Sequence, residues 1–161
     1  MNNILEHKII TEHAMIARVI TQATTIETML NAYIADFYTR CPNDNYQAPY
    51  LSFIYDIMNE RSMSLYTKIG VLFKVYKRLH GRNVTKSTKT LFEKWLSIRN
   101  KFAHGDYIAD KGILYNGEFF DVQELANKHA ELQVKVLAAL EGYADLRGPY
   151  FNQFPVKEAL K

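Results

Sequence analysis

Apolar residues recur every three or four positions along most of this chain, and this spacing is typical of amphipathic α-helices. One long helix, or two helices in line, is predicted over residues 4–38, which contain no proline or glycine. A loop rich in proline, asparagine and aspartate follows at residues 41–49, and the chain can form a short helix over residues 50–60. The apolar stripe of the first helix consists of Ile9, Ile16, Ile20, Ala23, Ile26, Leu30, Tyr33 and Phe37.

Two further helices are predicted in the middle of the chain. Ser62 is a suitable N-cap for the first of them, which reaches about residue 80 and ends at Gly81. Its inward residues are expected to be Leu65, Ile69, Leu72, Tyr76 and Leu79. The second extends over residues 87–104 and has two neighbouring apolar arcs, so it is expected to bury two sides. The arcs are formed by Leu91, Trp95, Ile98 and Phe102, and by Phe92, Leu96 and Ala103.

The pattern changes after residue 104. Short apolar runs at residues 107–109, 113–115 and 118–120 are separated by turn-forming residues, which predicts a small β-ribbon. The spacing of Asp121 and Glu124 is that of a capping box and opens a last helix. The apolar stripe of that helix consists of Leu125, Leu132, Val136, Leu140 and Tyr143.

The chain of 161 residues is expected to form a single domain over residues 1–161, with an irregular C-terminal tail at residues 148–161. Cys41 is the single cysteine, so no intramolecular disulfide can form, and a reducing cytoplasm is the expected location. No leader pattern, no apolar run of membrane-spanning length and no set of metal ligands is recognisable, so we expect no membrane partner, metal or cofactor.

Charge is segregated along the chain. The net charge is only +3, but residues 62–101 contain ten basic residues against the one acid Glu93, and this segment alone carries +9. The rest of the chain therefore sums to −6. Such a distribution favours a polyanionic partner, although a solvated basic face without a ligand is an equally simple explanation.

The basic segment ends in three residues that can do chemistry: Arg99, Asn100 and His104. His104 precedes Gly105, a residue type preferred just after a helix end, so the imidazole lies near unpaired carbonyl groups that favour its protonated form. Arg99 falls between the two apolar arcs, where a guanidinium is costly unless an acid, a phosphate or a subunit boundary meets it. Asn100 and His104 are four residues apart and share the polar edge.

The stretch from Arg99 to His104 resembles the HEPN superfamily, whose domains of four or five helices carry an arginine followed after four to six residues by a histidine. The order of a long first helix, a helix pair, a ribbon and a last helix is also similar. The resemblance implies an all-α HEPN-like bundle of four to five helices with a small β-hairpin after the motif helix. It also implies a homodimer that acts as a metal-independent endoribonuclease, in a toxin or a phage-defence effector with an antitoxin or other defence-system protein as partner.

In the mechanism that the resemblance implies, the RNA 2′-hydroxyl attacks the adjacent phosphorus while His104 moves a proton, leaving a 2′,3′-cyclic phosphate. Arg99 would stabilise charge on the phosphate oxygens, and Asn100 would orient His104 or the phosphate. The candidate substrate-binding residues are Lys94, Lys101 and Tyr107.

Two acidic residues are candidates for supporting roles. Glu27 lies on the apolar face of the first helix, which suggests an ion pair, with Arg99 as one candidate partner. Asp106 is close enough to His104 in sequence to raise the pKa of the imidazole, or it begins the turn. A branch of HEPN toxins has a modified tyrosine two residues after the histidine. Here Asp106 occupies that position and Tyr107 follows, so the modification is not expected.

Two other interpretations of the sequence stay open. One is a non-catalytic HEPN-like dimer that binds RNA, a nucleotide or a protein, including a regulator resembling the mannitol operon repressor. The other is a helical interaction domain in which the arginine-to-histidine segment only packs. Cleavage of RNA without divalent metal, with and without Arg99 and His104, separates these interpretations from the ribonuclease.

Overall fold

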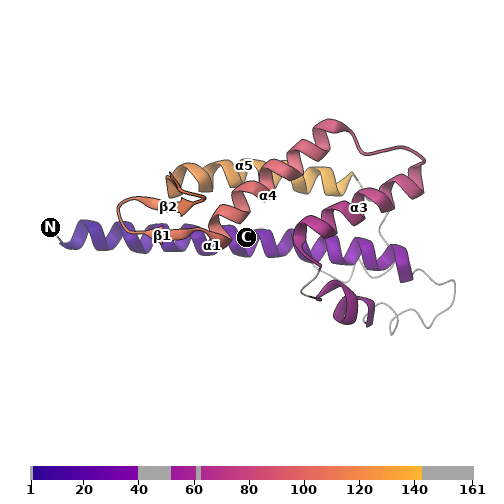
Figure 1. The fold of residues 1–161 in the computed structure, drawn as a ribbon, viewed down its shortest axis with the longest axis horizontal. Coiled ribbons are helices and arrows are strands. Elements are labelled where there is room, and N and C mark those ends of the chain that lie inside the picture. Colours follow the sequence, from indigo (N-terminus) through magenta and orange to yellow (C-terminus); the bar gives the residue numbers. More distant parts are fainter. Residues whose placement is uncertain (1, 40–51, 61–62, 143–161) are drawn as a thin grey trace. The chain divides into compact units, whose positions relative to one another are not determined.

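A computed structural model describes residues 2–39, 52–60 and 63–142 of the chain. The predicted loop at 41–49 and the tail at 148–161 lie outside the described residues, as do Cys41, Ser62 and Tyr143. The described part is mainly helical, with one small antiparallel sheet (Figure 1). Its elements are α1 (Asn2–Thr39), the π-helix η1 (Phe53–Met58), α3 (Leu65–His80), α4 (Lys86–His104), β1 (Asp106–Ile108), β2 (Gly112–Tyr115), β3 (Glu118–Phe120) and α5 (Val122–Glu141).

The contacts within the chain define two compact units, and the boundaries between them fall inside α1, α4 and α5. Unit 1 comprises Met1–Thr24 and Thr90–Ala138, and unit 2 comprises Thr25–Lys89 and Ala139–Lys161. Unit 1 therefore contains the sheet and the arginine-to-histidine segment. The single domain expected from the chain length stays a prediction.

The core of unit 1 is built from α1, α4, β2 and α5. Both apolar arcs predicted for α4 contribute to it, since Trp95 and Phe102 of one arc and Phe92 and Leu96 of the other are buried. The indole Nε1 of Trp95 donates to Gln133 Oε1 at 2.8 Å, and Gln133 Nε2 donates to the carbonyl oxygen of Gln22 at 2.9 Å. One buried amide side chain thus connects α4, α5 and α1. A central cluster consists of Val19, Phe102, Ile113, Val122 and Leu125.

Unit 2 buries the second half of the α1 stripe, including Ile26, Leu30 and Tyr33. The inward positions predicted for α3 are correct at Leu65, Ile69 and Leu72, but Leu79 is 41% exposed. Residues 77–83 are all exposed, so the end of α3 extends beyond the core. The spacing of apolar residues there no longer predicts which side chains are buried. Val75 and Lys68 are buried on α3 as well.

The helix α3 ends at the expected glycine, but its N-cap lies two residues after the expected serine. Its N-cap is Ser64, whose Oγ accepts a hydrogen bond from the Thr67 amide at 3.2 Å, whereas the sequence favoured Ser62. Both are serines, and the periodic pattern does not distinguish start positions two residues apart. Gly81 ends α3 with a φ of +66°, the left-handed conformation that glycine adopts without steric cost.

The sheet has the strand order β1-β2-β3, so the predicted hairpin is one part of a three-stranded meander. Tyr115 pairs with Glu118 across the two-residue loop Asn116-Gly117, where both φ angles are positive, at 51° and 82°. These values are those of a type I′ turn, which suits the twist of a hairpin. Asp121 then caps α5 by accepting the Glu124 amide hydrogen at 2.8 Å.

Candidate functional site

Arg99 projects from the buried side of α4. At 100° per residue it lies within about 40° of both Trp95 and Phe92, and its side chain is half-buried. Its Nε is fully buried and has no hydrogen-bond partner among the described residues. Its Nη1 donates to Asn100 Oδ1 at 3.2 Å. The guanidinium therefore donates to a neutral amide oxygen through Nη1, while its Nε has no hydrogen-bond partner among the described residues.

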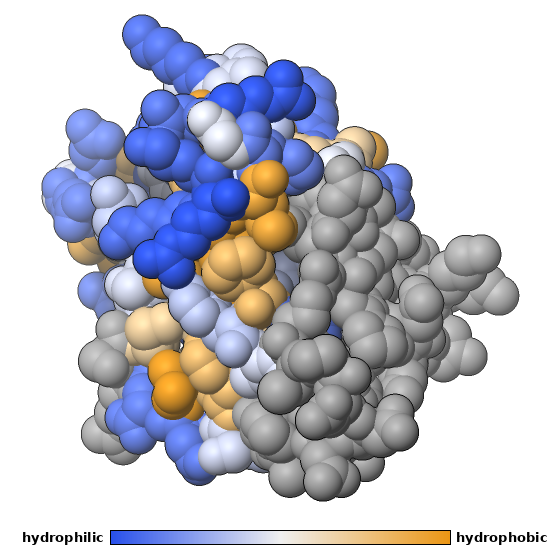
Figure 2. Space-filling model, turned by 90° about the vertical axis from the view of Figure 1, so that its right-hand side faces the viewer, coloured by the Kyte–Doolittle hydropathy of each residue, from blue (hydrophilic) through white to orange (hydrophobic). Residues whose placement is uncertain are grey.

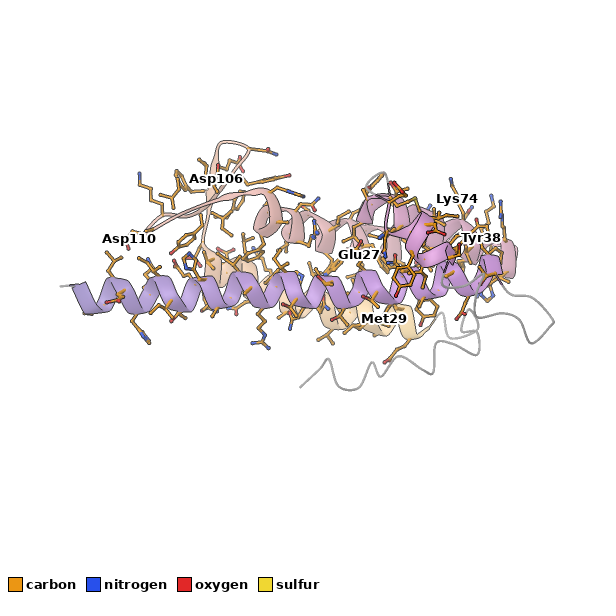
Figure 3. The ribbon with its side chains drawn as sticks, turned by 90° about the horizontal axis from the view of Figure 1, so that it is seen from below. Glu27, Met29, Tyr38, Lys74, Asp106 and Asp110 are labelled. Carbon is orange, nitrogen blue, oxygen red and sulfur yellow. The ribbon has the colours of Figure 1, made fainter. Side chains whose placement is uncertain are left out.

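The candidate partner for Arg99, Glu27, is engaged elsewhere. Its Oε1 accepts a hydrogen bond from Lys68 Nζ at 2.6 Å, and Lys68 is almost completely buried. Figure 3 shows Glu27 projecting from α1 on the side of α3, which carries Lys68. Glu27 therefore forms an ion pair within unit 2, with Lys68 in place of Arg99, and Arg99 forms no ion pair with any described residue.

His104 is the last residue of α4, and its side chain is exposed. The Gly105 amide donates to the Lys101 carbonyl oxygen at 3.0 Å, and Gly105 does not have a positive φ. A Cβ at this position would instead clash with Ile113 Cγ2 and would lie 2.5 Å from the Lys101 carbonyl oxygen. A glycine is required after His104 because β2 passes so closely. The left-handed backbone conformation that often ends a helix at glycine is not adopted here.

Asn100 links the two charged candidates. Around α4 it lies about 100° from Arg99 and about 40° from His104. Because its Oδ1 holds the Arg99 guanidinium, the outer end of the arginine is drawn toward the edge of the helix that carries His104. Asp106 is exposed on β1, opposite Leu114, and Figure 3 shows it on the side of the sheet away from α1.

Tyr107, two residues after Gly105, is tied to α1. Its hydroxyl donates to Glu12 Oε2 at 2.6 Å, and its ring contacts His13 edge-on with the ring centroids 4.7 Å apart. The hydrogen bond to Glu12 and partial burial raise the pKa of Tyr107 to about 12. The hydroxyl expected to contact substrate is thus already engaged within unit 1.

Lys94 and Lys101 do lie together, in a groove of about 500 Å³ between α4, β3 and α5. Lys101 Nζ stands 3.6 Å from the centroid of the Phe120 ring. The candidate residues Arg99, Asn100, His104 and Tyr107 do not line this groove. The remaining wall residues are Ser97, Ile98, Phe119, Phe120, Asp121, Glu124, Leu125, Lys128, Glu131 and Leu132.

Sequence reasoning missed two groups of residues near these candidates. Phe119 and Phe120 line the groove, and the sequence holds a signal for them. Adjacent residues of a strand point to opposite faces, so two consecutive aromatics after an Asn-Gly turn place at least one near the surface. Glu12, the partner of Tyr107, lies 95 residues away in sequence and no local pattern predicts that pair.

No metal site is visible among the described residues, where no three histidine, cysteine, aspartate or glutamate side chains lie close enough to hold an ion. None of the helices described is sufficiently long and apolar to span a membrane. Comparison of the chain with protein-family models, with curated proteins and with solved structures finds no match.

Proposed function

We propose that this protein is a metal-independent endoribonuclease of the HEPN type, acting in the cytoplasm as a toxin or phage-defence effector. The supporting observation is the hydrogen bond between Arg99 Nη1 and Asn100 Oδ1. It draws a guanidinium that has no acidic partner among the described residues toward the edge of α4 where His104 is exposed. A guanidinium without an acidic partner can bind a phosphate, and an exposed histidine can move a proton.

The active unit in this proposal is a homodimer. On one copy, Arg99 and His104 leave α4 about 140° apart, which is unfavourable for contacting a single phosphate. Two copies of α4 that face each other would bring both histidines and at least one arginine to the same phosphate. A partner that neutralises the enzyme, such as an antitoxin, would bind the same face or the cleft between the copies.

The reaction needs only groups that this chain carries. One His104 accepts the proton of the RNA 2′-hydroxyl as its oxygen attacks the neighbouring phosphorus. The bond from phosphorus to the 5′-oxygen breaks, and the leaving oxygen receives a proton from the His104 of the other copy. Arg99 stabilises the added negative charge on the non-bridging oxygens. The products are a 2′,3′-cyclic phosphate and a 5′-hydroxyl.

The test is cleavage of a mixed RNA in EDTA by the wild type and by Arg99→Met, Asn100→Ala and His104→Ala, with analysis of the new ends. We expect cyclic phosphate ends from the wild type and a loss of at least 100-fold for the arginine and histidine variants.

His80 is a matched control, because it also ends a helix before a glycine and is exposed. His80→Ala should cut RNA normally. Unimpaired cleavage by His104→Ala would exclude the acid and base role, and a wild type that binds RNA without cutting it would establish the non-catalytic alternative.

A further inference from the structure

The groove between α4, β3 and α5 is lined by charges of both signs, but its acids are engaged. Glu124 accepts a hydrogen bond from Lys128 Nζ at 2.7 Å, and Glu131 is paired with Lys135. Asp121 caps the first turn of α5. Two of the three carboxylates are therefore paired with lysines, and the third, Asp121, is hydrogen-bonded to a backbone amide.

The opposite wall carries cations that are not neutralised. Lys94 and Lys101 form no ion pair with any described residue. Lys101 is positioned over the Phe120 ring, a contact that holds the ammonium group without cancelling its charge. Phe119, next along β3, is 49% exposed although phenylalanine gains from burial. The wall thus combines two ammonium groups that have no acidic partner with an exposed aromatic ring, whose centroid lies 5.7 Å from Lys111 Nζ.

The same side of α4 leads to His104. Around the helix, Lys94, Ser97, Lys101 and His104 fall within about 80° of one another, and Lys101 precedes His104 by about 4.5 Å along the axis. A strand lying along this side of α4 would pass from the groove to the exposed imidazole. Arg99, by contrast, lies about 160° from Lys101 and does not belong to this path.

We propose that this groove binds the part of a single-stranded RNA that flanks the bond to be cut. Lys94 and Lys101 contact successive phosphates, and one unpaired base stacks on the Phe119 ring. Free ammonium groups next to an exposed aromatic are the combination that holds single strands without reading sequence, since every base has a face that stacks. The assignment of RNA rests on the function proposed above, whereas the groove itself is independent of Arg99 and His104.

The experiment measures binding apart from cleavage. A fluorescent ten-residue oligouridine with 2′-O-methyl groups cannot be cut by attack of its 2′-oxygen, and its affinity for the full chain is read by anisotropy at several salt concentrations. Phe119→Ala should weaken binding about 5- to 100-fold, and Phe119→Trp should restore it. Lys94→Ala and Lys101→Ala should each weaken binding and lower the salt dependence by roughly one phosphate contact.

Two matched controls test the assignment. Lys89→Ala removes an exposed lysine of α4 outside the groove, and Tyr66→Ala removes an aromatic ring that is 71% exposed on α3. Both variants should bind like the wild type. Equal losses from the groove variants and the controls would overturn the proposal, as would wild-type affinity in Phe119→Ala or tighter binding of a duplex of the same length.

The outcomes for the groove and for the ribonuclease are distinguishable. Binding that depends on Phe119 and Lys101 in a protein that never cuts RNA would retain the groove and refute the enzyme. Cleavage that depends on His104 but ignores Phe119, Lys94 and Lys101 would retain the enzyme and refute the groove.

Discussion

The hydroxyl of Tyr107 and the carboxylate of Glu12 form a 2.6 Å hydrogen bond that fastens the first strand to α1. Glu12 is buried, and its Oε1 lies 3.9 Å from Lys8 Nζ. Lys8 also approaches Asp110, in the turn after β1, at 3.7 Å. The strand that follows the motif helix is thus held by polar contacts to α1 in addition to its apolar packing.

Removing the Tyr107 hydroxyl should destabilise unit 1. Tyr107→Phe leaves the Glu12 carboxylate without its closest donor, and hydrogen bonds to charged groups contribute about 1.5–3 kcal/mol. We expect a loss of about 1–2 kcal/mol in chemical denaturation, because Lys8 and water take over part of the bond. Tyr115→Phe is the control, since its hydroxyl has no hydrogen-bond partner among the described residues and its removal should change stability little.

The hydrogen bond between Tyr107 and Glu12 should also make the stability of the protein depend on pH. The pKa of Tyr107 is raised to about 12 in the folded protein, above its usual 10, so the neutral hydroxyl is favoured by folding. This contribution is complete below pH 10 and is lost as the pH rises toward 12. Ultraviolet titration of the phenolates should show one tyrosine that ionises late and is absent in Tyr107→Phe. An unchanged titration curve in that variant would refute the assignment.

His129 should make the protein sensitive to acid. It is fully buried, its ring packs near Trp95, and neither ring nitrogen has a hydrogen-bond partner among the described residues. Burial lowers its pKa from 6.5 to about 4. Between these values the unfolded chain binds a proton that the folded chain does not, so stability falls as the pH drops from about 6.5 to 4 and the loss then levels off.

The measurement compares the free energy of unfolding at pH 7 and pH 5. The wild type should lose up to about 2 kcal/mol through His129, and His129→Leu should remove that part of the loss. Val136→Ala, a buried substitution on the same helix without a titratable group, should lower stability by similar amounts at both pH values. A His129→Leu protein that keeps the full acid sensitivity would contradict the prediction.

Two glycines should respond in opposite ways to alanine. At Gly105 a methyl group would meet Ile113 and the Lys101 carbonyl oxygen, so Gly105→Ala should cost about 1–3 kcal/mol. At Gly70, in the interior of α3, nothing lies within 4 Å of the added carbon. Gly70→Ala should therefore stabilise the protein by about 0.5–1 kcal/mol through helix propensity. Thermal or chemical denaturation of both variants checks the pair.

Removal of Glu27 and removal of Lys68 should lower stability by different amounts, although the two residues form one ion pair. Lys68 is 3% exposed and Glu27 is 31% exposed at the side chain. Glu27→Gln leaves an ammonium group buried without an anion and should cost about 3 kcal/mol, whereas Lys68→Met removes the buried charge and should cost less. The exposed pair of Lys128 and Glu124 is the control, and Lys128→Ala should change stability by less than about 0.5 kcal/mol.

Substitution of Arg99 distinguishes a role in RNA cleavage from a role in packing alone. Its Nε is buried without a partner, so Arg99→Met replaces an unsatisfied group by an apolar one of similar length. We expect unchanged or higher stability together with loss of RNA cleavage. Marked destabilisation of Arg99→Met would favour the interpretation in which this segment only packs.

The local patterns of the chain predicted much of the fold. The extents of α1 and α4, the turn at Asn116-Gly117 and the cap at Asp121 depend on neighbouring residues, and each is found as expected. Pairing between distant residues was not predictable in this way. Glu27 takes Lys68 as its partner because the choice depends on which helices lie side by side, and sequence spacing carries no information on this.

Part of the candidate site was likewise predictable from the sequence, and part was not. Periodicity correctly placed Arg99 among apolar residues and His104 at a helix end. The preference for glycine just after a helix end gave the wrong reason for Gly105, because the crowding at that glycine comes from β2. The groove was not predicted, because its second wall belongs to β3 and α5.

The single residue between α4 and β1 has a consequence for how His104 can work. With Gly105 pressed against Ile113 and no loop on either side, the backbone of the histidine is held by a helix before it and a sheet just after it. Only the rotation of the imidazole about its own side-chain bonds stays free. The backbone entropy is therefore already lost when the chain folds, and an incoming phosphate would have to fix only the side-chain rotation of the imidazole.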